Sequence, residues 1–347
     1  NVKSSGTVTT TSDTAGGLIG RVEYVTLTAS SSTSRVTSRE NTGGLIGLAL
    51  ISTIDTCFAS GAVSAVGFNQ VGGLIGNMAN HGSGVTVQNS FALGTVEGQS
   101  HVGGLIGYCR GTIRNSYARG SVSAISVSGG FCGRNHDLDS GGNSLIENSY
   151  ASGDVTLSGN DHAGGFIGHI YRRMTIRQSY ATGRVSAPNN TGGFVGSIDM
   201  GPILVERSYA TGSVSGNARV GGFLGYAYRY DATIDLKNNY ARGDVRANSD
   251  AGGFAGLAAA IVTYSYATGR VQMDQTEANL GGFMGRLLSG GTNSTPFTFW
   301  DADSSGRTSS ASGISRTGNQ MRDPATFVDF DTTSIWKIDP NQYPTLR

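Results

Sequence analysis

Charged residues are scarce in this chain. Asp, Glu, Lys and Arg together make up 14% of the 347 residues, whereas an average soluble protein has about a quarter. The formal net charge is +1, and no block of Lys or Arg occurs. Because binding to nucleic acid or to an anionic membrane surface requires concentrated positive charge, the sequence predicts neither as a partner.

Long apolar runs are missing too. The longest extends from Leu257 to Val262, whereas a membrane-spanning helix needs about 20 apolar residues. We therefore expect no membrane insertion.

Cysteine is rare as well. Cys57, Cys109 and Cys132 fall at three different positions of the repeat described below, so they do not form a column of equivalent residues. We predict three small buried apolar side chains rather than a disulfide. Few Cys and Lys with abundant Ser, Thr and Gly is typical of secreted proteins, so we expect an extracellular or cell-surface location.

What the chain has in abundance is glycine, in a repeated phrase. Gly accounts for 54 residues, more than twice the average usage. The phrase Gly-Gly-(Leu/Phe)-x-Gly occurs ten times at intervals of 26 to 35 residues, beginning at Gly16, Gly43, Gly72, Gly103, Gly129, Gly164, Gly192, Gly221, Gly252 and Gly281. A period of this size indicates a solenoid or another repeat array.

A second phrase accompanies the first. It reads Ser-Tyr-Ala-x-Gly-x-Val in the middle of the chain, as in Ser149 to Val155 and Ser179 to Val185. Phe58 and Phe91 replace the Tyr in two earlier repeats. Short Val, Ile, Tyr, Thr and Ser runs broken by Gly indicate strands and turns rather than helical repeats, and a unit of about 29 residues is too short for a propeller blade.

We therefore predict an all-β fold, a parallel β-helix (β-solenoid) of about ten coils with three short strands per coil. Right-handed winding is expected. At about 4.8 Å per coil the rod is about 50 Å long. Two apolar columns should face inward: the third position of the Gly-Gly phrase, which changes from Leu to Phe at Phe131, and the Val that ends the second phrase.

The chain divides into two parts at the end of the repeats. Residues 1–290 are predicted to form the solenoid, and 291–347 a C-terminal cap. Trp300, Phe327, Phe330 and Trp336 could cover the apolar end of the last coil; a separate binding module is the alternative. No signal peptide is recognisable and the chain starts inside a coil. We expect upstream polypeptide or a partner to cover the exposed strand edges of that coil.

The connection after each Gly-Gly phrase varies in length, and in a solenoid such insertions lie on one side, which is often the binding face. Polar and aromatic residues gather there in the middle coils. The predicted ligand-binding residues are Tyr108, Arg110, His136, Asp137, Asp139, His169, Tyr171, Arg172, Tyr226, Tyr228, Arg229, Tyr230 and Asp231. Tyr rings and charged groups in such a stripe suit a polysaccharide or cell-surface glycan. The alternative is an ordinary polar loop surface.

Catalysis on the same stripe is a second interpretation. Paired carboxylates hydrolyse glycosidic bonds, and Asp137, Asp139, Asp199 and Asp231 are the candidates, while His136 or His169 could act as the base of a lyase. Asp137, Asp139 and Asn143 also resemble the opening of a calcium loop. That loop lacks its distal Glu, so we favour a turn, and no cofactor is expected.

The two phrases resemble the GLUG motif, named for Gly-Leu-x-Gly and literal in Gly17-Leu18-Ile19-Gly20 and Gly104-Leu105-Ile106-Gly107. The resemblance covers residues 16 to 285. It implies a bacterial surface or secreted protein similar to filamentous-haemagglutinin-like adhesins, and it implies no catalytic residues. Three functions remain open from the sequence: an adhesin or glycan-binding solenoid, a polysaccharide hydrolase or lyase, and a passive stalk or fibre segment.

Overall fold

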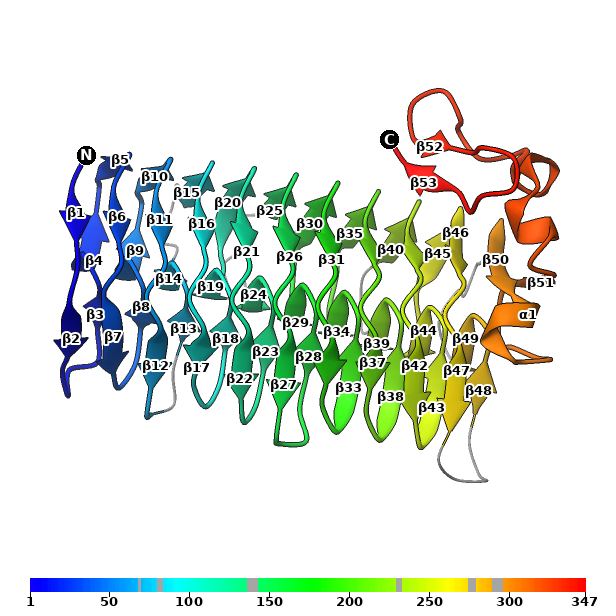
Figure 1. The fold of residues 1–347 in the computed structure, drawn as a ribbon, viewed down its shortest axis with the longest axis horizontal. Helices are drawn as coiled ribbons and strands as arrows, with labels where there is room; N and C mark the ends of the chain where they lie inside the picture. The colour runs from blue at the N-terminus through cyan, green and yellow to red at the C-terminus, as the bar shows by residue number, and fades with distance from the viewer. Residues whose placement is uncertain (68–69, 80–83, 136–142, 229–232, 274–278, 289–295) are drawn as a thin grey trace.

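The computed structural model describes residues 1–67, 70–79, 84–135, 143–228, 233–273, 279–288 and 296–347. Nearly all of them belong to a parallel β-solenoid that forms a rod (Figure 1), which confirms the predicted fold class. One coil in the middle of the rod consists of β26 (Tyr150–Ala151), β27 (Val155–Leu157), β28 (Ala163–Gly164), β29 (Ile167–Ile170) and β30 (Met174–Arg177). The prediction of three strands per coil is therefore wrong, because bends divide each coil into five; some contain glycine, and others contain a residue with positive φ such as Arg173 or Gln178.

Every strand pairs with its equivalents in the neighbouring coils. The first coil comprises β1 (Lys3–Ser4), β2 (Thr7–Thr9), β3 (Ala15–Gly16), β4 (Ile19–Glu23) and β5 (Thr26–Thr28). Among the described residues, the sheets that start at β2, β3 and β4 have ten strands each and end at β47 (Val271–Met273), β48 (Leu280–Gly281) and β49 (Met284–Leu287). The sheet from β5 ends at β45 (Ile261–Thr263). The sheet from β1 continues beyond β46 (Ser265–Ala267) into the C-terminal segment.

The register confirms that equivalent residues lie on top of one another. Gly164 pairs with Gly192, Gly192 with Gly221, and Gly221 with Gly252, and the same pairing links the first residues of all ten Gly-Gly phrases. The phrases thus form a single file along the rod.

Both predicted apolar columns are buried, but they belong to two separate cores. The Leu/Phe column lies in the larger core; its rings from Phe131 to Phe283 are 0% exposed and stack with centroids 4.6 to 4.9 Å apart. The Val column, from Val63 to Val271, forms a smaller core together with the apolar residues that precede several of the Gly-Gly phrases. The cross-section of the rod therefore has two lobes.

Glycine allows the close approach of backbone that these bends require. A Cβ atom added to Gly193 would lie 2.1 Å from the carbonyl oxygen of Gly222 and 3.1 Å from the Cβ of Ala210. The first distance is impossible for a real side chain. These glycines are thus needed for space rather than for a left-handed backbone conformation.

The Ser of the second phrase forms a buried ladder. The Ser179 N–H donates to Ser208 Oγ at 3.3 Å, and the Ser179 hydroxyl donates to the Arg177 carbonyl at 2.7 Å. Equivalent bonds link Ser90, Ser116 and Ser149. This ladder satisfies backbone groups at the turn and fixes the orientation of the neighbouring Tyr and Ala.

The cysteine prediction is wrong for two of the three residues. Cys109 and Cys132 form a disulfide, with Cα atoms 6.3 Å apart. Cys132 lies in the column of Ile106, whereas Cys109 lies three residues after Ile106 and also points into the core, so the bond crosses diagonally between adjacent coils. Only Cys57 is a buried thiol, as predicted; it occupies a place in the serine ladder, where the Ser90 hydroxyl accepts a hydrogen bond from its N–H.

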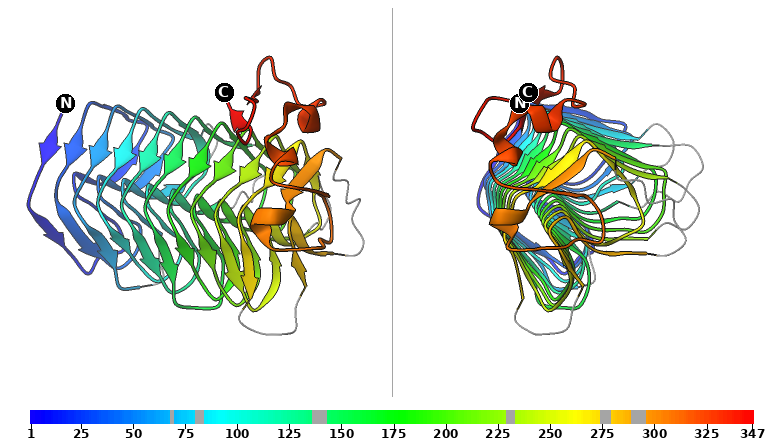
Figure 2. Two further views of the ribbon diagram at one scale, coloured as in Figure 1. Left: turned by 45° about the vertical axis from the view of Figure 1, so that its right-hand side comes forward. Right: turned by 90° about the vertical axis from the view of Figure 1, so that its right-hand side faces the viewer.

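The C-terminal segment covers more than the end of the rod. It contains β50 (Thr298–Asp301), α1 (Ala302–Ser305), β51 (Ile314–Arg316), the 3-10 helices η1 (Gln320–Arg322) and η2 (Pro324–Phe327), β52 (Trp336–Lys337) and β53 (Thr345–Leu346). Trp300 belongs to the main core, where its ring fills the space beside Gly282. Phe327, Phe330 and Trp336 pack instead against Tyr240 and Tyr266 on the flank of the rod, and the segment folds back over the last coils (Figure 2). The predicted aromatic cluster near the C-terminus is therefore present, with Trp300 in the main core and the other three aromatics on the flank.

Candidate functional site

Part of the predicted stripe forms a column. Tyr108, Arg134, His169, Ser197 and Tyr226 pair in register in five successive coils. Because these residues lie in the strand equivalent to β29 in each coil, their side chains follow one line along the rod. The column lies only partly at the surface: His169 is 4% and Ser197 0% exposed, whereas Tyr108, Arg134 and Tyr226 are half-buried.

Aromatic and cationic groups of the stripe contact one another. The Arg134 guanidinium lies 5.6 Å from the Tyr171 ring centroid and donates toward His101 Nε2 at 3.1 Å. Arg172 lies 5.9 Å from the same Tyr171 centroid. In the same way, Arg219 lies 5.3 Å from the ring of Tyr226. Such cation–π contacts hold the rings in fixed orientations.

Two His–Asp pairs lie side by side, one in the stripe and one just before the Gly164-Gly165 phrase. His169 Nε2 is 2.9 Å from Asp199 Oδ2, and His162 Nε2 is 2.8 Å from Asp161 Oδ1. The two imidazole rings are 4.6 Å apart. The two pairs therefore form a compact network of titratable groups rather than separate polar loops.

Burial and hydrogen bonding shift the pKa values of this network. Burial lowers the pKa of His169, and the Asp199 carboxylate opposes that effect only in part. His169 is therefore a neutral imidazole at pH 7 that donates its Nε2 proton to Asp199. Burial alone would raise the pKa of Asp161, but hydrogen bonds from His162 and Ser126 outweigh it and lower the pKa to about 2.

The structure places seven of the predicted ligand-binding residues. They are Tyr108, Arg110, His169, Tyr171, Arg172, Tyr226 and Tyr228. The other six lie outside the described residues: His136, Asp137, Asp139, Arg229, Tyr230 and Asp231. Of the four catalytic candidates only Asp199 is described. Its carboxylate is held by His169.

The calcium-loop prediction falls mostly outside the described residues, because it includes Asp137 and Asp139. Asn143 is described, and its side-chain amide donates to Thr175 Oγ1 at 2.8 Å. Within the described ranges, no group of three His, Cys, Asp or Glu side chains could hold a metal ion.

A groove begins where the stripe ends. It has a volume of about 600 Å³ and lies on the strands equivalent to β30 in the middle coils. Pro202 and Leu204 supply its accessible apolar surface, and Met174 and Ile203 lie buried beneath it. The polar side chains that line it are Asn143, Arg173, Thr175, Thr233 and Asp235. Burial raises the pKa of the Asp235 carboxyl group. Arg173 directly follows the stripe residues Tyr171 and Arg172 in the sequence.

A second surface, not predicted from the sequence, is formed by the outward Tyr of the second phrase. Phe58, Phe91, Tyr117, Tyr150, Tyr180, Tyr209, Tyr240 and Tyr266 form a continuous stack with ring centroids 4.7 to 5.2 Å apart; we call it the aromatic ladder. The signal was present in the alternation of buried Ser, half-exposed Tyr and buried Ala, which is the period of a strand with one solvent-facing side.

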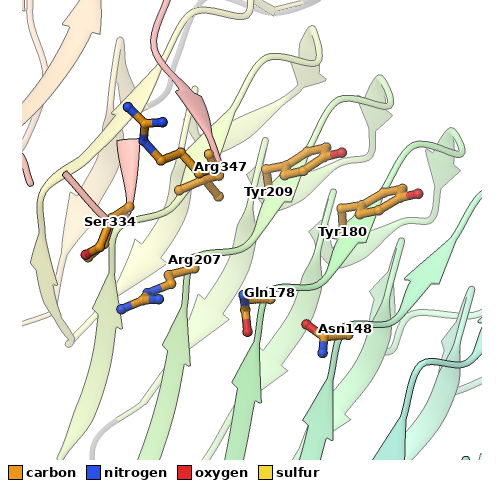
Figure 3. A pocket seen from close by; sticks show the side chains of 9 residues that line it. Asn148, Gln178, Tyr180, Arg207, Tyr209, Ser334 and Arg347 are labelled. Carbon is orange, nitrogen blue, oxygen red and sulfur yellow. The ribbon is translucent and has the colours of Figure 1, made fainter. Parts of the chain in front are cut away.

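A pocket of about 360 Å³ lies where the C-terminal segment meets this ladder. Figure 3 shows Tyr180 and Tyr209 side by side, with Gln178 and Arg207 in the adjacent row and Arg347 opposite. Ile335 and Leu346 complete the apolar lining. One wall of the pocket is thus the ladder and the other is the C-terminal segment.

The fold defines the chain as a β-solenoid repeat protein, and two known proteins contain similar sequence. Halomucin from Haloquadratum walsbyi is 34% identical over 204 residues, which cover 53% of this chain and 2% of halomucin. A protein of Evansella cellulosilytica, described as a Gly-rich membrane protein, is 33% identical over 86 residues, which cover 24% of this chain and 10% of that protein. The chain therefore spans a small fraction of the length of both relatives.

Further comparisons add no family. No protein-family model matches the chain, so the resemblance to the GLUG family stays a prediction. No solved structure matches it either. A search of the described residues finds no helix with the length and apolar character needed to cross a membrane.

Proposed function

We propose that this chain is a rod-shaped segment of an extracellular surface protein and that it binds a polysaccharide on its middle coils. The observation that carries the proposal is the groove beside the stripe. Its apolar floor suits the C–H faces of a sugar ring, while Arg173, Asp235 and Asn143 at its edges can bond to hydroxyl or acidic groups.

The surface location is supported by two further observations. Disulfides persist mainly in oxidising compartments outside the cytosol, and this chain has one in its core. The two relatives are a mucin by name and a protein described as a Gly-rich membrane protein. A long rod of stacked coils with a binding surface on its flank suits attachment of a cell or secreted protein to a glycan.

The binding experiment uses the intact chain on an array of neutral and acidic polysaccharides. Arg173→Gln and Asp235→Asn should each weaken binding of the captured polysaccharide by about tenfold, which corresponds to the loss of one charge-assisted hydrogen bond. Calorimetric titration with an oligosaccharide of the captured type measures the change.

Matched controls are available on another face of the rod. Arg184 and Asp244 are exposed residues that precede the Val column, so Arg184→Gln and Asp244→Asn should leave binding unchanged. Equal weakening by the control variants would contradict the groove as the binding site. If the wild-type chain binds no polysaccharide, the proposal is wrong and a passive stalk is the better description.

A further inference from the structure

The aromatic ladder has a covered part and an uncovered part. Tyr240 and Tyr266 are 5% and 0% exposed, because the chain's own C-terminal segment packs on them. Phe58, Phe91, Tyr117, Tyr150 and Tyr180 are all half-exposed. The stack continues without a break from one part to the other.

In the covered part, Arg242 fastens a polypeptide to the ladder. Its guanidinium lies 4.7 Å from the ring centroid of Tyr240, its Nε donates to the Tyr266 hydroxyl at 3.0 Å, and its Nη2 donates to the Pro344 carbonyl at 2.7 Å. The Tyr266 hydroxyl donates to the same carbonyl oxygen. Arg242 and Tyr266 therefore each donate to the same backbone carbonyl, while the Tyr240 ring contacts the guanidinium.

The same arrangement occurs in the uncovered part, around Arg119. Its guanidinium lies 4.9 Å from the ring centroid of Tyr117, and its Nε and Nη2 donate to the Tyr150 hydroxyl at 3.2 and 2.8 Å. Arg119 is exposed. The geometry that receives Pro344 in the covered part is thus formed in advance on the open ladder.

Arginine at this position is not a general feature of the repeat. The equivalent residues from the third coil onward are Ser60, Leu93, Arg119, Ser152, Thr182, Thr211, Arg242 and Thr268. Only two of these are arginines, and one of the two holds a polypeptide segment. The rings stack equally well in the coils that carry Thr182 or Thr211 at this position. Arg119 is therefore not needed for the stacking of the rings.

We propose that Arg119, Tyr117 and Tyr150 form a docking site for an extended polypeptide segment of a partner protein. The segment would have the chemistry of Tyr343-Pro344 in this chain: an aromatic side chain that packs beside the ladder, followed by a backbone carbonyl that accepts from Arg119 and Tyr150. The inference is independent of the polysaccharide proposal, because it concerns a different face of the rod.

The geometry favours a polypeptide over a sugar chain as the occupant. Each ring in the ladder covers the faces of its neighbours, with interplanar angles of 1° to 4° from Phe58 to Tyr209. A sugar ring that needs an open aromatic face finds only ring edges and hydroxyl groups. The pocket lined by Tyr180, Tyr209 and Leu346 lies between the covered and the uncovered part of the ladder. The docked segment would therefore lie next to the chain's own C-terminal segment.

The test uses the intact protein and a fluorescent synthetic peptide with the sequence of residues 335–347. Fluorescence anisotropy should show saturable binding to the wild-type protein. Arg119→Gln should weaken it at least fivefold, and a peptide carrying Tyr343→Ala should weaken it similarly. Arg184→Gln, an exposed arginine on another face, is the matched control and should have no effect.

Other outcomes overturn the proposal. Absence of peptide binding, or equal binding to wild type and Arg119→Gln, would mean that Arg119 does not receive a polypeptide segment. Sedimentation of the protein alone tests whether the occupant is a second copy of this chain. Concentration-dependent dimers that Arg119→Gln abolishes would identify a second copy instead of a partner protein. A further outcome is that the protein binds a polysaccharide in a way that Arg119→Gln abolishes and Arg173→Gln leaves intact. That result would identify the occupant of the ladder as a glycan.

Discussion

Two aromatic columns run side by side along this rod, and their comparison shows what a periodic sequence can build. The inner column, Phe131 to Phe283, and the outer ladder, Phe58 to Tyr266, stack at almost the same spacing. The inner rings are 0% exposed, while most of the outer rings are half-exposed. One coil geometry therefore serves stability on the inside and offers a surface for recognition on the outside.

The difference between the columns arises from what surrounds each ring. An inner ring such as Phe194 contacts core side chains on every side, so its removal would leave a cavity. An outer ring such as Tyr180 contacts its stacked neighbours, Tyr150 and Tyr209, and its edge faces the surface. Identical stacking distances therefore do not imply equal contributions to stability.

The largest expected effect separates these two columns. Phe194→Ala should lower the free energy of unfolding by about 3–5 kcal/mol, because the coils above and below prevent collapse of the cavity. Tyr180→Ala in the same coil should cost about 1 kcal/mol, since only the stacking contacts are lost. A denaturant titration of both variants measures the difference. Equal costs would contradict the assignment of inner and outer columns.

A second prediction compares the covered and uncovered parts of the ladder. Tyr266→Phe removes a buried hydroxyl that bonds to Arg242 and to the Pro344 carbonyl, so it should cost about 1–3 kcal/mol. Tyr150→Phe removes a half-exposed hydroxyl that bonds to Arg119 and should cost less than about 1 kcal/mol. Thermal unfolding of the two variants provides the measurement, and a larger loss for Tyr150→Phe would reverse the comparison.

Alkaline pH should act mainly on the covered part. Burial raises the pKa of Tyr240 to about 12, above the value of about 10 expected for an unfolded chain. The unfolded state therefore releases this proton first, and stability falls as the pH rises from 10 toward 12. By pH 11 the loss is about 1 kcal/mol. Tyr240→Phe should make the unfolding free energy less sensitive to pH in this range; an unchanged slope would show that Tyr240 ionises freely in the folded protein.

The smallest effect on the unfolding free energy is expected at Thr182, two residues after the ladder residue Tyr180. Thr182 is an exposed residue that follows the buried Ala181, so Thr182→Ala should change the unfolding free energy by no more than about 0.5 kcal/mol. The Phe194→Ala titration provides the reference. A loss above about 2 kcal/mol would mean that this position is packed and that the outward direction has been misassigned.

Much of the fold could be predicted from the sequence, because in a solenoid each column repeats the same environment. The change from Leu to Phe at Phe131 and the unbroken Val column were sufficient to identify two inward positions. The half-buried Leu18 and Leu27 of the first coil agree with an end that lacks a neighbour on one side.

The features that could not be predicted depend on contacts between different columns. The disulfide joins Cys109 to Cys132 because Ile106 and Cys109, three residues apart, both point inward, which a strict alternation does not suggest. The path of the C-terminal segment depends on bonds such as that between Arg242 and Pro344, which are 102 residues apart in the sequence. The repeat alone places His169 and Tyr226 at equivalent positions, but the pairing of His169 with Asp199 depends on the spacing of adjacent coils.

One measurement tests the stacking of coils most directly: pyrene fluorescence of proteins labelled at two introduced cysteines. Thr182 and Thr211 occupy equivalent positions in adjacent coils, about 4.8 Å apart, so Thr182→Cys/Thr211→Cys should give strong excimer emission. Ser60→Cys/Thr211→Cys places the labels five coils apart, about 24 Å, and should give monomer emission only. Excimer emission from the distant pair, or its absence from the adjacent pair, would contradict a rod in which equivalent residues of successive coils lie on top of one another.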